Sequence, residues 1–381
     1  MRTIINEKFE TVYYSASHNK IVDDSEALNI SLNLKINDYH NLIDNGLHTL
    51  RNTGKYKYFV GLASIPPRSI IKAHDDYYEV ISCLDKNKYD KFVNKEKLLK
   101  EATKIIGNFS NAKVGVELSG GLDSSLIIEA LLKNNIDPIL IGFTSDKFEF
   151  RTERIIQDFY KKKVSDSILL KYEDCYAFDN LTNVPSHPIP VCNSHFFYRH
   201  TTMARVAKKN NLDILFSGEA GDQLFGFESN LNNFKMTNNF NYWNLAEHWS
   251  DQYVYRKYGV KYLSAIALGS LPSMILSLRF GQKKDPMKLW ARNYFKDCLP
   301  KELSNYAYTA YHDGWVMDGL LNALESILEM SQKTYDKFKI ENLHPSKMKD
   351  KSLVYCSLGA ADRKKFLLNL SFVVWYYKMV Q

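Results

Sequence analysis

The sequence predicts an α/β fold in which helices cover both faces of a parallel sheet, with a helical C-terminal part and a small β-rich N-terminal region. Three patterns lead to this expectation. Short apolar segments alternate with amphipathic ones between residues 113 and 226, polar residues in short alternating runs precede them, and a helical pattern follows residue 244.

The N-terminal region, residues 1–95, is expected to be rich in β-structure. Residues 56–65 and 77–83 alternate between apolar and polar side chains, which is the pattern of strands with one buried face. Residues 86–100 are dense in charge and are expected to form a linker that enters a helix. Residues 96–381 form the second predicted domain.

The parallel sheet is expected within residues 113–226. Its strands should be short and apolar, because helices would cover both of their faces. The segments that fit are 113–118, 138–143, 167–170 and 213–216, with helices predicted over 124–134, 152–162 and 194–210.

The part of the chain after the sheet is predicted to be mostly helical. Residues 227–244 are rich in asparagine and aromatic residues, and they form either a lid over a ligand or an ordinary surface loop. Residues 262–278 form the most apolar run, but Pro272 and the serines favour two buried helices over a membrane span. The closing segment, residues 366–380, is expected to pack in the core.

Composition limits the class of protein. The 381 residues carry 50 basic and 43 acidic side chains, and this mild excess suits an anionic ligand without indicating a nucleic-acid-binding protein. Five scattered cysteines with no C-x-x-C pair argue against zinc and iron–sulfur sites and for free thiols in a reducing compartment. No apolar signal-peptide region follows Met1, so the expected location is cytoplasmic, with no membrane partner.

Residues 118–125, L-S-G-G-L-D-S-S, lie between an apolar strand and a predicted helix. The paired glycines let the main chain approach a ligand, and the N–H groups at the start of the helix favour an anion. The segment therefore predicts a phosphate or pyrophosphate loop, the alternative being a glycine-rich turn with no ligand. Asp123 would repel that anion unless a cation lay between them, so the loop also predicts Mg²⁺.

This loop lacks the G-x-x-x-x-G-K-S/T pattern. It resembles the pyrophosphate loop of the ATP pyrophosphatase superfamily, whose members have an adenine nucleotide alpha hydrolase-like fold and split ATP between the α and β phosphates. A second block, residues 217–226, resembles the S-G-E-G-A-D-E-L-F-G signature of the asparagine synthetase family. It departs from that signature at Ala220, Gly221 and Gln223, and lasso-peptide cyclases of the same family often carry Gly-Asp at this place.

Two strand ends each bring an aspartate, and the carboxyl ends of parallel strands collect ligands in one crevice. Asp123 and Asp222 are therefore the predicted Mg²⁺ ligands and catalytic residues, although Asp222 alone would be read as a helix cap. The resemblance implies that Glu219 acts as a base or orients the nucleophile. It also implies an ATP site made of Leu118, Ser119, Gly120, Gly121, Asp123, Ser124 and Ser125 at the phosphates, Ile141 at the adenine, and Ser217 and Gly218 at the ribose or adenine.

Glutamine hydrolysis is not expected. Glutamine-dependent asparagine synthetases expose a cysteine once Met1 is removed, whereas this chain has Arg2 there and its first cysteine is Cys83. Residues 66–68, P-P-R, resemble the P-P-G segment near the end of the glutaminase domain, so residues 1–95 are interpreted as a truncated remnant of it. β-Lactam synthetases, carbapenam synthetases and lasso-peptide cyclases also lack that cysteine, and they close a ring with an amine of the substrate.

One feature of the family is missing from the sequence. The family has a lysine that contacts the adenylate and pyrophosphate, and ungapped alignment places Tyr308 at that position. Loss of this charge would reduce transition-state stabilisation by ~2–4 kcal/mol. The lysines that could replace it are Lys283, Lys284, Lys288 and Lys296.

The resemblance implies an ATP-dependent amide-forming ligase that adenylates a carboxylate, releases pyrophosphate and joins the acid to an amine. The expected substrate is a small molecule or peptide that carries both groups, and a precursor-processing protein would be its partner. The alternatives are an ammonia-dependent asparagine synthetase, an envelope-sugar amidotransferase and a catalytically silent nucleotide-binding subunit. A tRNA-thiolating relative would need paired cysteines and a strongly basic face, which the sequence lacks.

Overall fold

The computed structural model describes residues 1–8, 10–36, 38–40, 55–65, 69–83, 93–147, 150–181, 185–189, 196–225, 246–279, 288–304 and 312–380. The predicted lid at residues 227–244 and the P-P-R segment at 66–68 lie outside the described residues. Lys283, Lys284 and Tyr308 lie outside them as well.

A five-stranded parallel sheet forms the centre of the fold, in the order β10–β9–β8–β11–β12. All neighbouring pairs in this sheet are parallel. The strands are β8 (Val114–Glu117), β9 (Ile139–Thr144), β10 (Ser167–Lys171), β11 (Ile214–Ser217) and β12 (Lys261–Ser264). The predicted α/β fold with a parallel sheet is confirmed, and β8 to β11 fall on the predicted strands.

Strand β12 shows that the prediction of two buried helices over residues 262–278 is wrong. The segment begins with β12, continues through a single 3₁₀ turn at Ala265–Ala267, and ends in the α-helix α9 (Leu271–Arg279). Pro272 stands in the first turn of α9, where the helix tolerates a residue without an N–H. Hydrophobic periodicity cannot show whether so short an apolar run is a strand or a helix. Residues 261–264 form a strand because they pair with the edge of β11.

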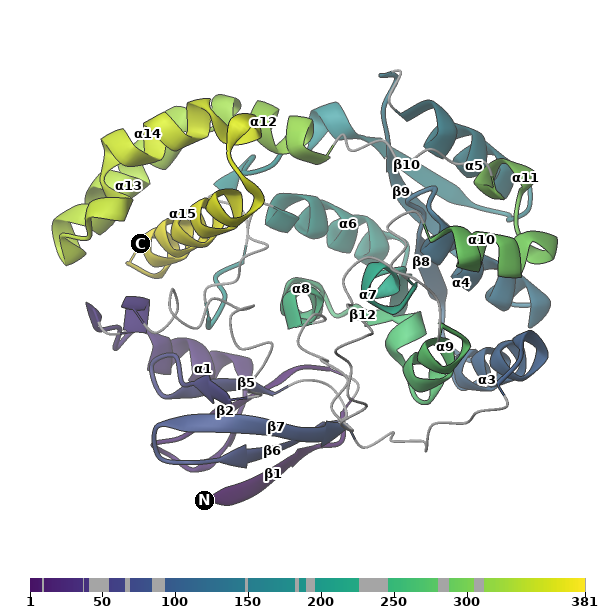
Figure 1. Cartoon of the computed structure of the whole chain (residues 1–381), viewed down its shortest axis with the longest axis horizontal. Coiled ribbons are helices and arrows are strands. Elements are labelled where there is room, and N and C mark those ends of the chain that lie inside the picture. Colours follow the sequence, from purple (N-terminus) through teal and green to yellow (C-terminus); the bar gives the residue numbers. More distant parts are fainter. Residues whose placement is uncertain are drawn as a thin grey trace.

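Helices cover both faces of the parallel sheet (Figure 1). Phe216 packs in one core cluster, whereas the preceding Leu215 packs in the cluster on the opposite face. One face carries α3 (Lys95–Gly107), α4 (Leu122–Lys133), α5 (Arg151–Lys161) and α9, and the other carries α6 (Phe197–Lys209) and α8 (Ala246–Arg256). This arrangement confirms the predicted helices on both faces.

The N-terminal region contains two small antiparallel sheets together with helix α1 (Asp24–Ser31), in agreement with the predicted β-rich region. One sheet has the order β1–β6–β7–β4, with β1 (Arg2–Asn6), β6 (Ser69–Ala73), β7 (Tyr77–Cys83) and β4 (Lys55–Lys57). The other has the order β3–β2–β5, with β3 (Lys20–Val22), β2 (Val12–Ser15) and β5 (Leu62–Ile65). Helix α1 begins where the Asp23 side chain accepts a hydrogen bond from the Glu26 N–H at 2.8 Å.

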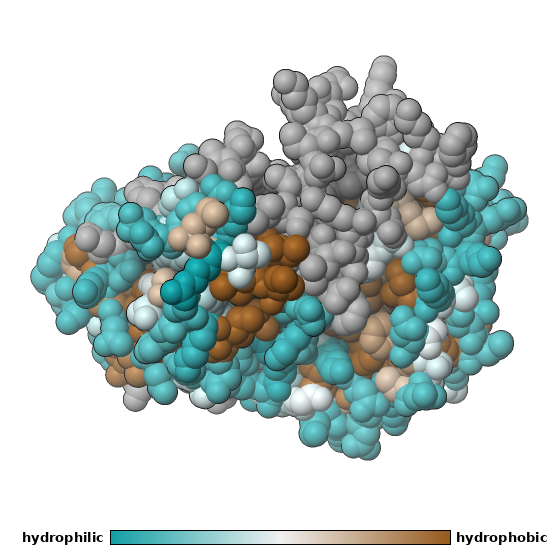
Figure 2. All heavy atoms as spheres, turned by 90° about the horizontal axis from the view of Figure 1, so that it is seen from below, coloured by the Kyte–Doolittle hydropathy of each residue, from teal (hydrophilic) through white to brown (hydrophobic). Residues whose placement is uncertain are grey.

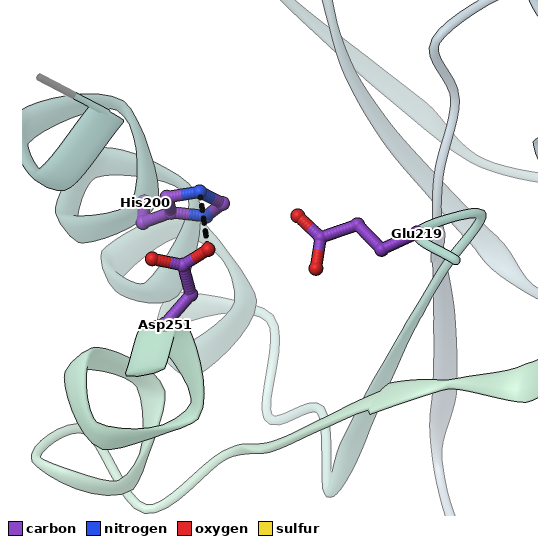
Figure 3. A group of neighbouring side chains, drawn as sticks. All are labelled: His200, Glu219 and Asp251. Carbon is purple, nitrogen blue, oxygen red and sulfur yellow. Dashed lines mark ion pairs between the residues drawn. The ribbon is translucent and has the colours of Figure 1, made fainter. Parts of the chain in front are cut away.

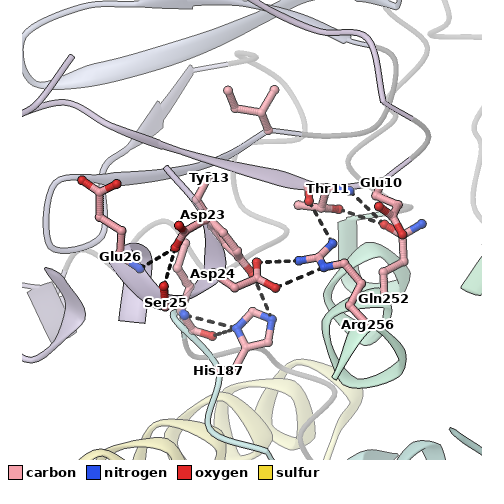
Figure 4. A network of polar contacts seen from close by, with 12 residues as sticks. Glu10, Thr11, Tyr13, Asp23, Asp24, Ser25, Glu26, His187, Gln252 and Arg256 are labelled. Atoms are coloured by element: carbon pink, nitrogen blue, oxygen red, sulfur yellow. Dashed lines mark hydrogen bonds and ion pairs between the residues drawn. The ribbon is translucent and has the colours of Figure 1, made fainter. Parts of the chain in front are cut away.

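Polar contacts join the N-terminal region to helix α8 (Figure 4). The Thr11 N–H donates to Gln252 Oε1 at 3.0 Å, and Arg256 donates to the Asp24 carboxylate through Nε at 3.2 Å and Nη2 at 2.9 Å. A two-point guanidinium–carboxylate contact fixes direction as well as distance. The N-terminal sheets are thus held against a helix that covers the central sheet, and the domain boundary near residue 95 stays a prediction.

The C-terminal part is helical, as predicted. The long helix α15 buries Phe366, Leu370 and Phe372 against the preceding helices, which confirms that the closing segment packs in the core. The remaining helices are α7 (Gly221–Phe225), α10 (Leu289–Phe295), α11 (Lys301–Ser304), α12 (His312–Asn322), α13 (Leu324–Phe338), α14 (Pro345–Leu353) and α15 (Ala360–Val380).

The surface gives no sign of a membrane-spanning segment in the part of the chain that the structure describes. None of the described helices combines the length and the apolar character that crossing a membrane requires. Figure 2 shows hydrophilic residues over much of one face, with apolar residues in smaller groups between them.

Candidate active site

The two glycine-containing loops predicted from the sequence meet in the structure. They follow β8 and β11, which are neighbouring parallel strands, so both loops leave the same edge of the sheet. A Cβ atom added to Gly221 would lie 2.0 Å from the Asp123 carboxyl carbon, and one added to Gly218 would lie 2.8 Å from the Ser124 nitrogen. Close approach of the loops therefore requires glycine at both positions. We call Asp123, Gly218, Gly221 and the neighbouring Lys288 the loop junction.

The first loop is shaped by its own hydroxyl groups. Gly120 has φ +80°, and a Cβ there would lie 2.8 Å from the Glu153 Cα, so the position favours glycine on two counts. Ser119 Oγ accepts a hydrogen bond from the Gly121 N–H at 3.2 Å, and Ser125 Oγ donates to the Gly121 carbonyl at 2.8 Å. Helix α4 starts directly after Gly121, so its first N–H groups stand at the loop, where an anion is favoured.

In the second loop, Ala220 and Gly221 stand in the reverse order of the Gly-Ala pair in the family signature, and the structure explains this order. Ala220 adopts φ +75°, a left-handed conformation that costs an alanine about 1–2 kcal/mol. Gly221 is the residue that faces the Asp123 carboxylate, within a distance where a Cβ would overlap it. The Ala-Gly order therefore places glycine at position 221, where a Cβ would overlap Asp123, and leaves the strained left-handed conformation to Ala220.

Lys288 lies at the loop junction and is hydrogen-bonded through Nζ to Asp123 Oδ2. Both side chains are largely buried, with 9% of the lysine side chain and 17% of the aspartate side chain exposed. Lys288 immediately precedes helix α10 and has φ +53°. Four lysines could replace the missing family residue, and the structure describes two of them, Lys288 and Lys296. Lys296 is an exposed residue of a 3₁₀ turn.

The structure describes the side chain of only one of the two predicted Mg²⁺ ligands, Asp123. The Asp123 carboxylate occupies the space left by the missing Cβ of Gly221, and Asp222 is the next residue of α7. Two carboxylates on adjoining loops suit a hard cation that prefers oxygen ligands. The side chain of Asp222 lies outside the described atoms, so its pairing with Asp123 stays a prediction.

The remaining predicted ATP residues are mostly buried. Leu118, Ile141 and Ser217 have no exposed surface, and the Leu118 N–H donates to the Ile141 carbonyl at 2.8 Å. The Ile141 side chain packs in the core cluster under α6 and α8. Its predicted contact with adenine, like the other ligand contacts, stays a prediction.

A second group of ionisable residues lies at the same sheet edge and was not predicted from the sequence, apart from Glu219. Glu117, the last residue of β8, accepts hydrogen bonds from Arg199 Nη2 at 2.7 Å and from the Tyr262 hydroxyl at 2.9 Å. Burial raises the pKa of the Glu117 carboxyl, Arg199 opposes that rise, and the nearby charge of Glu219 adds to it. An acid inside the apolar strand V-G-V-E is the signal that could have revealed this residue.

Glu219 faces His200 of α6 and Asp251 of α8 (Figure 3). The facing ligand atoms of these three residues all lie within 4.8 Å of one another. His200 Nε2 is 3.3 Å from Asp251 Oδ2, and His200 Nδ1 is hydrogen-bonded to the Tyr255 hydroxyl at 3.1 Å. We call Glu117, Arg199, His200, Glu219 and Asp251 the polar cluster.

The main chain positions Glu219 in this cluster. Its N–H donates to Ser217 Oγ at 3.1 Å, and its carbonyl accepts a hydrogen bond from Ser264 Oγ at 2.5 Å. Since Ser264 ends β12, the neighbouring strand holds the Glu219 loop in place. Glu219, the predicted catalytic acid, is thus fixed at the carboxyl end of the sheet. In the sequence it lies between Gly218 and Gly221 of the loop junction, and in space its side chain faces helices α6 and α8.

Residues 95–347 match the sequence model of the asparagine synthase family, which covers more than half of the chain. The chain therefore belongs to the asparagine synthase family, a family of ATP-dependent amide-forming ligases.

One similar curated protein comes from Methanocaldococcus jannaschii and is provisionally named asparagine synthetase 2, of the glutamine-hydrolyzing kind. The two are 24% identical over 159 residues, which are 39% of this chain and 30% of that protein. The chain thus matches less than a third of the length of this relative. Among solved structures, the NMN synthetase of Francisella tularensis aligns with a TM-score of 0.32 and 13% identity, over 76% of this chain and 97% of that one.

Proposed function

We propose that the protein is an ATP-dependent ligase that adenylates a substrate carboxylate, releases pyrophosphate and joins the acyl group to an amine. The observation that carries this proposal is the loop junction, where Gly218 and Gly221 leave room for Asp123 beside the start of α4. Main-chain N–H groups from Gly120 to Ser125 would bind the leaving pyrophosphate, because the start of a helix favours an anion.

Of the two candidate lysines that the structure describes, Lys288 is the better placed to substitute for the lysine that the sequence lacks near Tyr308. It is already at Asp123, and its ammonium would add positive charge where negative charge accumulates on the departing pyrophosphate. Asp123 and Asp222 would hold Mg²⁺, which when bound withdraws charge from the β and γ phosphates.

The reaction that we propose has two displacements. A carboxylate oxygen of the substrate bonds to the α phosphorus of ATP, and the bond from that phosphorus to the pyrophosphate oxygen breaks. The amine nitrogen then bonds to the acyl carbon, AMP leaves with the bridging oxygen, and the amine gives up a proton. Glu219 is the proposed acceptor of that proton or the group that orients the amine.

We propose further that the amine is carried by the substrate itself, a small molecule or a peptide, so that the product is a ring. The support is the Gly221-Asp222 pair, which resembles the Gly-Asp that lasso-peptide cyclases of the family often carry at this place. If the substrate is a peptide, a protein that processes its precursor would be the partner. The competing reactions are amidation by free ammonia and amidation of an envelope sugar acid.

The first experiment tests nucleotide binding. Calorimetry with AMP-CPP and Mg²⁺ should show one site on the purified chain, and Asp123→Ala should abolish binding. Asp297→Ala is the matched control, since Asp297 also pairs with a lysine, but its side chain is 72% exposed and its partner, Lys95, begins helix α3 and belongs to neither loop. Equal binding by Asp123→Ala and the parent chain would sink the assignment.

The second experiment separates the competing reactions. Pyrophosphate release from ATP is measured with a panel of carboxylates, with and without ammonium. Asparagine formed from aspartate and ammonium would favour the simpler synthetase, whereas release that depends on an amino acid or peptide but not on ammonium would favour cyclisation. Binding of AMP-CPP without release for any acid would indicate a silent nucleotide-binding subunit.

A further inference from the structure

We propose that His200, Glu219 and Asp251 form a binding site for a divalent transition-metal ion of the Zn²⁺ or Mn²⁺ type. The site goes beyond the proposed ligase activity but shares Glu219 with it, and a Glu219 carboxylate that binds the ion would orient the amine rather than accept its proton.

Three separate elements bring these side chains to one point (Figure 3). His200 comes from α6, Asp251 from α8 and Glu219 from the loop after β11, and their facing ligand atoms lie within 4.8 Å of one another. Metal–ligand bonds of about 2.0–2.2 Å place two ligands of one ion about 3.0–3.4 Å apart. The 3.3 Å between His200 Nε2 and Asp251 Oδ2 matches that spacing, and the half-buried Glu219 side chain would close the third side by a small movement.

The surroundings of His200 are those of a metal ligand. Histidines that bind metals usually engage their second ring nitrogen in a hydrogen bond, which sets the tautomer and the ring orientation. His200 Nδ1 lies 3.1 Å from the Tyr255 hydroxyl. Tyr255 is itself held by stacking on Tyr262, with ring centroids 4.1 Å apart and an angle of 3° between the planes. In the tautomer whose Nδ1–H donates to Tyr255, Nε2 has the lone pair that an ion needs.

The local charge also favours a cation. Asp251 is fully buried and His200 is 4% exposed, so the charges there are poorly screened by water. Arg199 pairs with Glu117 and so balances only one of the three carboxylates of the polar cluster. Burial raises the pKa of the Glu117 carboxyl, Arg199 opposes that rise, and the nearby charge of Glu219 adds to it. Carboxylates crowded in a buried place become more stable when a divalent ion lies between them.

The donor set predicts which ion would bind. One imidazole nitrogen and two carboxylates suit Zn²⁺, Mn²⁺ or Fe²⁺, whereas Mg²⁺ and Ca²⁺ prefer oxygen ligands alone. Three protein ligands leave a coordination position for water or for a substrate atom. The ion would also fasten the Glu219 loop to helices α6 and α8, so its binding should raise thermal stability.

The test uses the full chain, treated with EDTA, dialysed against Zn²⁺ and analysed for metal content. We expect one Zn²⁺ per chain, a higher melting temperature with Zn²⁺ than with EDTA, and no such gain from Mg²⁺. His200→Ala and Glu219→Gln should each lower Zn²⁺ affinity by at least about 10-fold. His18→Ala is the matched control, since His18 is an exposed histidine that contacts only nearby serines in the described structure, and it should bind like the parent chain.

Replacement of Zn²⁺ by Co²⁺ gives a readout that does not depend on stability. Visible absorption bands of Co²⁺ that His200→Ala loses would support the site, even if that variant is less stable. Failure of the parent chain to retain Zn²⁺, Mn²⁺ or Co²⁺ would overturn the proposal, and so would equal retention by the parent chain and His200→Ala. Asp123→Ala should keep the metal while losing AMP-CPP, so failure of the metal site and failure of the nucleotide site are distinguishable.

Discussion

The loop junction and the polar cluster lie at the same edge of one sheet, but they are built in different ways. The loop junction is made of main chain, glycines and one aspartate–lysine pair, and the contacts of Gly218 and Gly221 leave no room for a Cβ. The polar cluster is made of longer side chains from β8, α6, α8 and the loop after β11, packed among aromatic rings. The geometry of the loop junction therefore depends on glycine at particular positions, whereas the geometry of the polar cluster depends on how the helices and strands pack.

The largest effect should follow removal of the charge at the loop junction. Lys288→Met keeps the side-chain length but removes the ammonium that contacts Asp123. If Lys288 stabilises the departing pyrophosphate, the rate of pyrophosphate release should fall about 10²–10³-fold. Lys296→Met, at an exposed lysine on the same stretch, should leave the rate unchanged. A normal rate for Lys288→Met would show that Lys288 is only a structural partner of Asp123.

A change in volume alone should break the loop junction nearly as strongly. Gly221→Ala would place a Cβ 2.0–2.3 Å from the atoms of the Asp123 carboxylate, so that carboxylate must move. Misplacement by about 1 Å commonly lowers catalytic rates about 10²-fold, and we expect a loss of that order in pyrophosphate release and a weaker affinity for AMP-CPP. Unchanged affinity would mean that the two loops are looser than this structure shows.

For the polar cluster, the expected effect is a pH dependence of stability rather than a response to side-chain volume. Burial raises the pKa of Glu117 above its ordinary value of 4.5, so the folded chain keeps this proton at pH values where the unfolded chain has lost it. The contribution of Glu117 to the free energy of unfolding is therefore largest below pH 4.5 and decreases as pH rises toward the folded-state pKa. Glu117→Gln cannot titrate and should lack this decrease.

Urea unfolding across this pH range measures the difference between Glu117→Gln and the parent chain. The parent chain should lose stability relative to the variant as pH rises. A difference that does not change with pH would indicate that Arg199 fully offsets the burial of the carboxylate.

The smallest effect is expected at a glycine outside both groups. Gly107 ends helix α3, and a Cβ there would meet nothing within 4 Å. Gly107→Ala should be neutral or should stabilise the chain by up to about 1 kcal/mol in urea unfolding, because alanine restricts the unfolded chain. We attribute the sensitivity of position 221 to substitution to its contact with Asp123. If Gly107→Ala also lowered pyrophosphate release, that explanation would be wrong.

The comparison also shows where reasoning from the sequence succeeded. The L-S-G-G-L-D-S-S segment predicted strand, loop and helix, and the structure has β8 ending at Glu117 and α4 beginning at Leu122. The second block predicted another strand end, which is β11. Short apolar strands between amphipathic helices are local signals, so the sheet could be predicted segment by segment.

Other features could not be predicted in this way. The conformation of β12 cannot be predicted locally, because its four residues carry no decisive period and only pairing with β11 makes them a strand. Lys288 could not be chosen from four candidate lysines, since its contact with Asp123 spans 165 positions of sequence. Arg199, His200 and Asp251 carried no motif, and their importance appears only when α6 and α8 pack beneath the sheet.

The sequence by itself determined the α/β sheet, its glycine-containing loops and membership of the asparagine synthase family, because these depend on short runs of neighbouring residues whose conformation is local. Only the tertiary structure decided which lysine meets Asp123, why glycine stands at position 221, and that Glu219 faces a histidine and a buried aspartate. Those contacts join residues that are far apart in the chain, and their distances are set by the packing of whole helices and strands.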